Sequence, residues 1–242
     1  MSNSKLADIK VPASTSNYTK GRDYKISKIT IHHMAGKLTA KQCGRVFQAK
    51  GRNASAHYGV GSDGKIGLYV DEKNAAWADG NRTSNHKSVT IETANSSTGG
   101  KWPVSAKTLN LLIKLVADIA KRNKLGKLVV GKNLTYHSMY ANTACPGPYL
   151  KSKMQYIADE ANKINGYGTT AKKTTTKTTT STKSFKVKVS IDDLNIRTGP
   201  GTKYKSKGFI EPGVYTIVET DGKWGKLKSG AGWIHLDYVK KV

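Results

Sequence analysis

Hydrophobic residues in the first two thirds of the chain alternate between short β-type runs and helical stripes. Ile26, Ile29 and Ile31 in "KISKITIHHM" predict a strand. "AHYGVGSDGKIGLYV" predicts two short strands joined by a turn at Asp63-Gly64, and "SVTIETAN" (88–95) is another β-branched run. We expect these runs to be strands of the sheet of this region.

Three helical patterns accompany the strands. "TAKQCGRVFQAK" (39–50) begins with Thr39 as a plausible N-cap. Residues 105–124 place an apolar stripe at i, i+3, i+4 and i+7 spacing, and a last helix is expected to begin at Pro148, directly after "CPG". The combination predicts an α/β domain over residues 1–165, with a mixed β-sheet covered by helices.

A second domain is expected after a change of composition. Residues 166–184 consist largely of threonine, lysine and glycine, cannot bury enough apolar surface to form a core, and predict a flexible linker. Residues 185–242 show short β runs separated by Gly- and Pro-containing turns, with no helical period. This pattern predicts a small all-β barrel of about sixty residues, near the lower size limit for an unaided core.

The formal net charge of +25 favours a polyanionic partner, either nucleic acid or an anionic surface such as a Gram-positive cell wall. Charge alone does not separate these two, and scattered lysines can also serve solubility. Two cysteines exclude a disulfide framework of the small secreted kind. No signal-type segment or membrane-span-length run is seen, so synthesis as a soluble cytoplasmic product is expected.

Candidate chemistry gathers on histidines and one cysteine. His32 lies in a predicted strand, and His137 precedes Cys145 by eight residues in the loop-forming "HSMYANTACPG". Two imidazoles and a thiolate are the ligand types that a catalytic Zn²⁺ takes, with a fourth position left open. Spacing alone does not decide between a metal site and a structural role, because a strand histidine is often only a hydrogen-bonded polar residue. Cys43, amid helical positions, is expected to pack in the core.

Four motifs together resemble a known family. Their order and spacing are similar to those of the zinc-dependent N-acetylmuramoyl-L-alanine amidases, which include phage endolysins and resemble animal peptidoglycan recognition proteins. The motifs are "ITIHHMAG", "SAHYGVGSDG", "NHKSVTIETAN" and "HSMYANTACPG". The resemblance implies that His32, His137 and Cys145 bind zinc, whereas His33 is not a ligand. It further implies that Glu92 is the acid/base group in hydrolysis of the amide between N-acetylmuramic acid and L-alanine.

The sequence departs from some relatives at two positions. Ala56 stands where several carry a tyrosine, and Thr143 stands where several carry a lysine, both associated with the developing oxyanion. We therefore expect zinc to provide most of the oxyanion stabilisation, with Thr143 as a weak hydrogen-bond donor. Two further residues stay open: His57 as a neighbour of the cleft, and Trp77 as either a cleft or a core aromatic.

The second domain resembles a bacterial SH3-type (SH3b) domain. The resemblance rests on "LNIRTGPG" and "GWIHLDYV" and implies a cell-wall-targeting module that would concentrate the catalytic domain at its substrate. Its aromatic residues either form a peptide-binding face or fill the core. They are Tyr204, Trp224, Trp233 and Tyr238.

The favoured hypothesis is a peptidoglycan hydrolase, an endolysin that is made in the host cytoplasm and acts on the Gram-positive wall after release. A host autolysin of the same activity and a binding-only recognition protein are the alternatives. A thiol hydrolase with Cys145 as nucleophile and His137 as base fits the spacing poorly. A nucleic-acid binder has no support besides the charge, so no nucleic-acid partner is predicted. No membrane span is predicted either.

Overall fold

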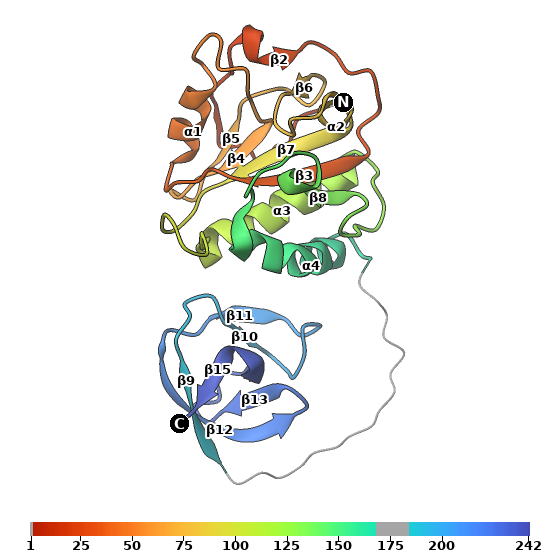
Figure 1. Cartoon of the computed structure of the whole chain (residues 1–242). Helices are drawn as coiled ribbons and strands as arrows, with labels where there is room; N and C mark the ends of the chain where they lie inside the picture. Colours follow the sequence, from red (N-terminus) through yellow and green to blue (C-terminus); the bar gives the residue numbers. More distant parts are fainter. Residues whose placement is uncertain (1, 168–183) are drawn as a thin grey trace. The chain divides into compact units, whose positions relative to one another are not determined.

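The computed structural model describes residues 2–167 and 184–242 (Figure 1). The chain divides into two compact units, Met1–Thr169 and Thr170–Val242. The linker predicted at 166–184 falls mainly on residues 168–183, which lie outside the described residues. Each unit has its own apolar core.

A six-stranded mixed sheet organises the N-terminal unit. In spatial order its strands are β1 (Ile9–Lys10), β5 (Ile66–Leu68), β4 (Tyr58–Val60), β7 (Ser88–Thr93), β3 (Lys28–His33) and β8 (Leu134–Tyr136). The three strands β4, β7 and β3 are parallel neighbours, β8 is parallel to β3, and only β4 and β5 pair antiparallel. The interior strands are rich in fully buried β-branched residues, as expected for a sheet covered on both faces.

Two long helices cover one face of this sheet (Figure 1). They are α3 (Ala106–Arg122), capped by Ser105, and α4 (Gly147–Ile164). Their leucine and isoleucine stripes share one core with β3, β4 and β7. The predicted α/β architecture with a mixed, helix-covered sheet is therefore confirmed.

Shorter elements cover the other parts of the sheet. Helix α1 (Ala40–Val46) begins with a capping box between Thr39 and Gln42, and its Cys43 packs in a second, smaller core, as predicted. The helix ends at Val46, before the predicted Lys50, and its C-cap residue Phe47 packs in the same small core. The remaining elements are η1 (Thr15–Asn17), β2 (Tyr18–Thr19), β6 (Ala75–Ala76), α2 (Arg82–Lys87) and η2 (His137–Met139).

The C-terminal unit is all-β, as predicted, with an antiparallel seven-stranded sheet around one apolar core. In spatial order the strands are β11 (Ser206–Phe209), β10 (Asn195–Arg197), β14 (Trp233–His235), β13 (Trp224–Leu227), β12 (Gly213–Asp221), β9 (Phe185–Val189) and β15 (Val239–Lys241). A 3-10 turn, η3 (Leu236–Tyr238), precedes β15. Of the aromatic residues singled out above, Trp233 is buried, whereas Tyr204 and Tyr238 are exposed.

None of the helices in residues 2–167 and 184–242 combines the length and apolarity that a bilayer crossing requires.

Candidate active site and metal centre

The three side chains predicted to bind one metal ion converge at one edge of the sheet. His32 lies in β3, His137 begins η2, and Cys145 lies just before α4. One potential ligand atom of each lies within 4.8 Å of the others. The Sγ of Cys145 is 3.7 Å from Nδ1 of His32, and the rings of His32 and His137 have centroids 4.6 Å apart.

Strand pairing explains why residues a hundred positions apart meet. β8 runs parallel to β3 with Tyr136 opposite Ile31, so both strands end at the same edge and His137 emerges beside His32. The loop then turns back, because the N–H of Ser138 donates to the carbonyl of Cys145 at 3.1 Å. The chain enters α4 through a left-handed Gly147 with φ +82°, where a Cβ would press on Trp102 at 3.1 Å.

Burial and charge set the protonation of the two imidazoles in different ways. Burial would lower the pKa of His32, but hydrogen bonds with Asp79 and Cys145 raise that pKa well above its ordinary value. Burial, and then the neighbouring His32, lower the pKa of His137 to about 4. His137 is therefore a neutral imidazole at pH 7, the form that binds metals. Two nitrogen donors and one sulfur donor that converge from one strand and one loop fit a zinc ion.

Glu92 lies next to this cluster on the neighbouring strand. The parallel register of β3 and β7 pairs His32 with Glu92, so the two side chains project from the same face. Burial raises the pKa of Glu92 to about 7, against the opposing effects of His32 and Arg52. Its Oε2 is buried and has no hydrogen-bond partner within residues 2–167 and 184–242. A buried carboxyl oxygen without a partner is unusual in a purely structural role.

Comparison with known proteins decides the family. Residues 22–148, more than half of the chain, match the family model for N-acetylmuramoyl-L-alanine amidase. The chain belongs to this amidase family. It is accordingly a peptidoglycan hydrolase with amidase activity. The matched segment contains His32, Glu92, His137 and Cys145.

Solved structures share the fold of the amidase unit. The structure of PlyL is similar with a TM-score of 0.54 at 19% identity, covering 65% of this chain and 97% of that one. The solution structure of the PlyG catalytic domain has a TM-score of 0.53 at 22% identity, covering 68% and 98%. A mutant endolysin from Bacillus subtilis has a TM-score of 0.52 at 21% identity, covering 64% and 99%. Among curated proteins, none matches the sequence.

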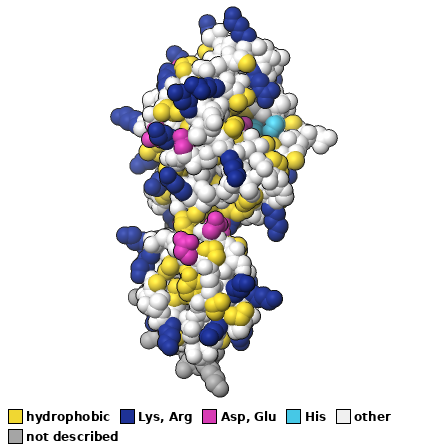
Figure 2. Space-filling model, turned by 90° about the vertical axis from the view of Figure 1, so that its left-hand side faces the viewer, with side chains coloured by type: hydrophobic (Ala, Val, Ile, Leu, Met, Phe, Trp, Pro, Cys, Tyr) yellow, Lys and Arg dark blue, Asp and Glu magenta, His cyan; other side chains and the backbone are white. Residues whose placement is uncertain are grey.

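The amidase carries a cleft of about 440 Å³ over the cluster. Its lining includes the three candidate ligands, Glu92 and three aromatic side chains, Phe47, Trp77 and Trp102. Trp77 is a half-buried cleft residue whose Nε1 donates to Thr19 Oγ1 at 2.8 Å, which resolves the two readings in favour of the cleft. Figure 2 shows histidine side chains at the surface, with lysine and arginine side chains scattered over that face.

Two residues singled out from the sequence lie elsewhere. His57 does not line the cleft: it is fully buried, with Nδ1 2.9 Å from Thr90 Oγ1 and Nε2 2.6 Å from Arg22. Burial, followed by the charge of Arg22, lowers the pKa of His57 well below its ordinary value. Ala56 is also buried outside the cleft, whereas Thr143 lines it.

Sequence reasoning missed two residues of this region. Trp102 lines the cleft and meets the ring of His33 edge-on at 5.1 Å between centroids. Asp79 lies behind His32, with Oδ1 3.1 Å from His32 Nε2. Asp79 stands in "AWADG" beside Trp77, and an acidic residue within an apolar segment was the available signal.

Proposed function

We propose that the amidase holds one zinc ion through His32, His137 and Cys145 and hydrolyses the bond between N-acetylmuramic acid and L-alanine of the stem peptide. The observation that supports this most is the convergence of the three donors beside the unpartnered Oε2 of Glu92. When bound, zinc supplies Lewis acidity toward the amide carbonyl and lowers the pKa of water.

Glu92 has the position and protonation for the acid/base role. As a carboxylate it accepts the proton of the attacking water, and as a carboxylic acid it returns that proton to the departing amine of L-alanine. A pKa of about 7 makes both forms accessible at neutral pH. The unpartnered Oε2 leaves this oxygen available to the water instead of committing it to an ion pair.

Thr143 offers an additional hydrogen bond in the cleft. Its Oγ1 accepts from the N–H of Cys145 at 3.2 Å, and a hydroxyl has one proton of its own to donate. We propose that this proton is a minor donor toward the oxyanion, with zinc as the main stabiliser.

The C-terminal residues 185–242 complete the proposal as an SH3b module that binds the Gram-positive cell wall. Supporting features are the all-β fold, the excess of basic residues and the exposed Tyr204 and Tyr238. The proposed organisation is a catalytic domain over 1–165, a linker over 166–184 and this module. On this basis the protein is an endolysin or an autolysin acting on the wall from solution.

One assay on purified Gram-positive walls tests the catalytic proposal. A chelator should abolish lysis, zinc should restore it, and digestion should release new N-terminal alanine without reducing sugar. Glu92→Gln should lower the rate by about 10²–10⁴-fold, whereas Glu211→Gln, an exposed carboxylate in the C-terminal unit, should not. Inactivation by a thiol alkylator but not by a chelator would instead support Cys145 as a nucleophile.

Removal of residues 185–242 tests the targeting role. The shortened protein should bind walls more weakly and lyse them more slowly, because the tether no longer raises its local concentration. Hydrolysis of a soluble muropeptide should be spared, since the candidate site lies wholly within the N-terminal unit. Equal losses on both substrates would contradict a targeting function.

A further inference from the structure

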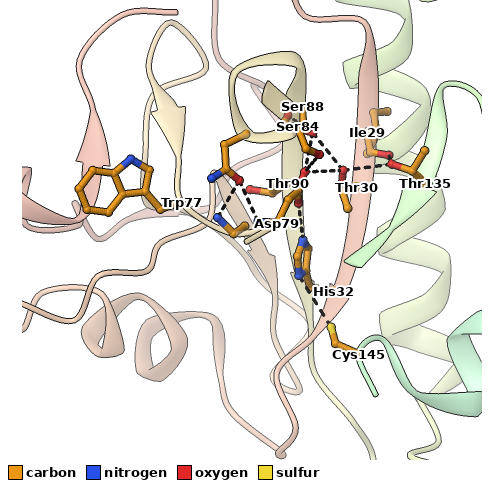
Figure 3. A network of polar contacts seen from close by, with 12 residues as sticks. Ile29, Thr30, His32, Trp77, Asp79, Ser84, Ser88, Thr90, Thr135 and Cys145 are labelled. Atoms are coloured by element: carbon orange, nitrogen blue, oxygen red, sulfur yellow. Dashed lines mark hydrogen bonds and ion pairs between the residues drawn. The ribbon is translucent and has the colours of Figure 1, made fainter. Parts of the chain in front are cut away.

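A buried carboxylate lies on the far side of the proposed metal ligand His32. Asp79 has no exposed surface and sits in the segment between β6 and α2. Its Oδ1 is 3.1 Å from His32 Nε2, while the other ring nitrogen, Nδ1, is 3.7 Å from Cys145 Sγ (Figure 3). The imidazole is therefore held between a carboxylate and a candidate metal ligand, with one nitrogen directed at each.

The second oxygen of Asp79 is committed to hydroxyl groups. Thr30 Oγ1 lies 3.2 Å and Ser88 Oγ 2.8 Å from Oδ2, and Ser84 Oγ donates to the same oxygen (Figure 3). The backbone is held as well, because the N–H of Asp79 donates to Asn85 Oδ1 at 2.8 Å. A carboxylate only accepts hydrogen bonds, so this environment fixes its position and leaves Oδ1 for the histidine.

One of these hydroxyls is oriented by a cation. Lys28 Nζ donates to Ser84 Oγ at 2.8 Å, so the proton of Ser84 is directed to Asp79. Both Lys28 and Ser84 are buried. A continuous path of hydrogen bonds thus runs from Lys28 in β3 through Ser84 in α2 and Asp79 back to His32 in β3.

We infer that Asp79 is a positioning residue that commits Nε2 of His32 and so presents Nδ1 to a metal ion shared with His137 and Cys145. The inference rests on the proposed zinc site. A metal-binding imidazole whose second nitrogen donates to a carboxylate has a fixed tautomer and ring orientation and is a more basic ligand. Without Asp79, the N–H at Nε2 of His32 would be buried without a hydrogen-bond acceptor, and the imidazole ring would lose its fixed orientation.

Zinc affinity of the full-length protein tests the inference independently of activity. We expect Asp79→Asn, which keeps the shape and removes the charge, to weaken zinc binding by about 10–100-fold in competition with a chromophoric chelator. Ser84→Ala, which removes only the oriented donor, should cause a smaller loss in the same direction. Asp63→Asn is the matched control, because the Oδ1 of that exposed carboxylate accepts from the Ala40 N–H in a separate loop.

The outcomes separate this inference from the metal site itself. If the wild-type protein binds zinc no better than His32→Ala, the proposed metal site fails. If the wild type binds zinc tightly and Asp79→Asn binds it equally well, the metal site stands and the positioning role is overturned. Lower thermal stability of Asp79→Asn with unchanged zinc affinity would likewise assign Asp79 a purely structural role. Should Asp79→Asn not fold, unchanged affinity in Ser84→Ala overturns the inference.

Discussion

The two sides of the candidate site are built differently. On the strand side, His32 and Glu92 project from paired interior strands, and Asp79 holds His32 from behind. On the loop side, His137 and Cys145 are half-buried and are held by backbone turns and one hydroxyl bond. The sheet supplies a rigid reference position, and the loop brings the remaining donors to it.

Burial shifts the pKa of an acid and that of a base in opposite directions. It raises the pKa of the acidic Glu92 to about 7 and lowers the pKa of the basic His137 to about 4, because in both cases it disfavours the charged form. The same physical effect therefore prepares a carboxyl group for proton transfer and an imidazole for metal binding. The direction of the shift depends on whether the buried group is an acid, such as Glu92, or a base, such as His137.

Removing one histidine from each side should give the largest effects. His32→Ala and His137→Ala should both lose zinc, with amidase activity falling by about 10³-fold or more as the three-ligand site breaks. The stability of the metal-free proteins should differ, because only His32→Ala leaves Oδ1 of buried Asp79 without its partner. Removing one partner of a buried pair lowers the free energy of unfolding by about 3–5 kcal/mol. Substitution of the half-buried His137 should lower it by less than about 1 kcal/mol.

Metal analysis and urea unfolding of the metal-free variants check this prediction. Equal destabilisation by the two substitutions would show that the strand side is no more rigidly built than the loop side.

Glu92→Gln should stabilise the metal-free protein while removing activity. The folded-state pKa of about 7 lies above the ordinary 4.5, so folding penalises the ionised carboxylate. The penalty is absent below pH 4.5, grows between pH 4.5 and 7 and is complete above pH 7. A neutral glutamine avoids it, and the free energy of unfolding at pH 8 should rise by up to about 3 kcal/mol. Thermal unfolding at pH 8 and pH 4.5 measures this difference in stability. Glu92→Gln should be more stable than the wild type at pH 8 and equally stable at pH 4.5.

The smallest expected effect is the pH dependence of kcat/KM. Within one protein it distinguishes Glu92 on the strand side from His137 on the loop side, because the two groups titrate in different pH ranges. Glu92 must be ionised to accept a proton, so kcat/KM should fall about tenfold per pH unit below its pKa and level off above it. The charge of bound zinc lowers this pKa, which places the midpoint at or below pH 7. His137 stays neutral until about pH 4, where its protonation should release zinc. A flat profile between pH 5 and 8 would remove Glu92 from the acid/base role.

Long periodic elements were predictable because their signal is contained in one stretch of chain. The stripe of α3, the cap of α1 at Thr39 and the β-branched runs of β3 and β7 all appear where they were expected. The six-residue α2 and three-residue β8 were not predicted, since segments of that length hold less than two periods of a helix or strand pattern. β11 and β15, at the ends of the second sheet, were also missed, because each contains a single apolar residue and therefore no alternation.

The sequence by itself determined which chemistry was available: His32, His137, Cys145 and Glu92 are recognisable from residue type, spacing and resemblance. Only the tertiary structure decided how these groups are oriented and charged. The carboxylate of Asp79 lies 47 residues from His32 in sequence and meets it through the packing of β3 against the segment before α2. Such contacts depend on which buried surfaces come together, and burial then sets each pKa, so neither can be read from local sequence.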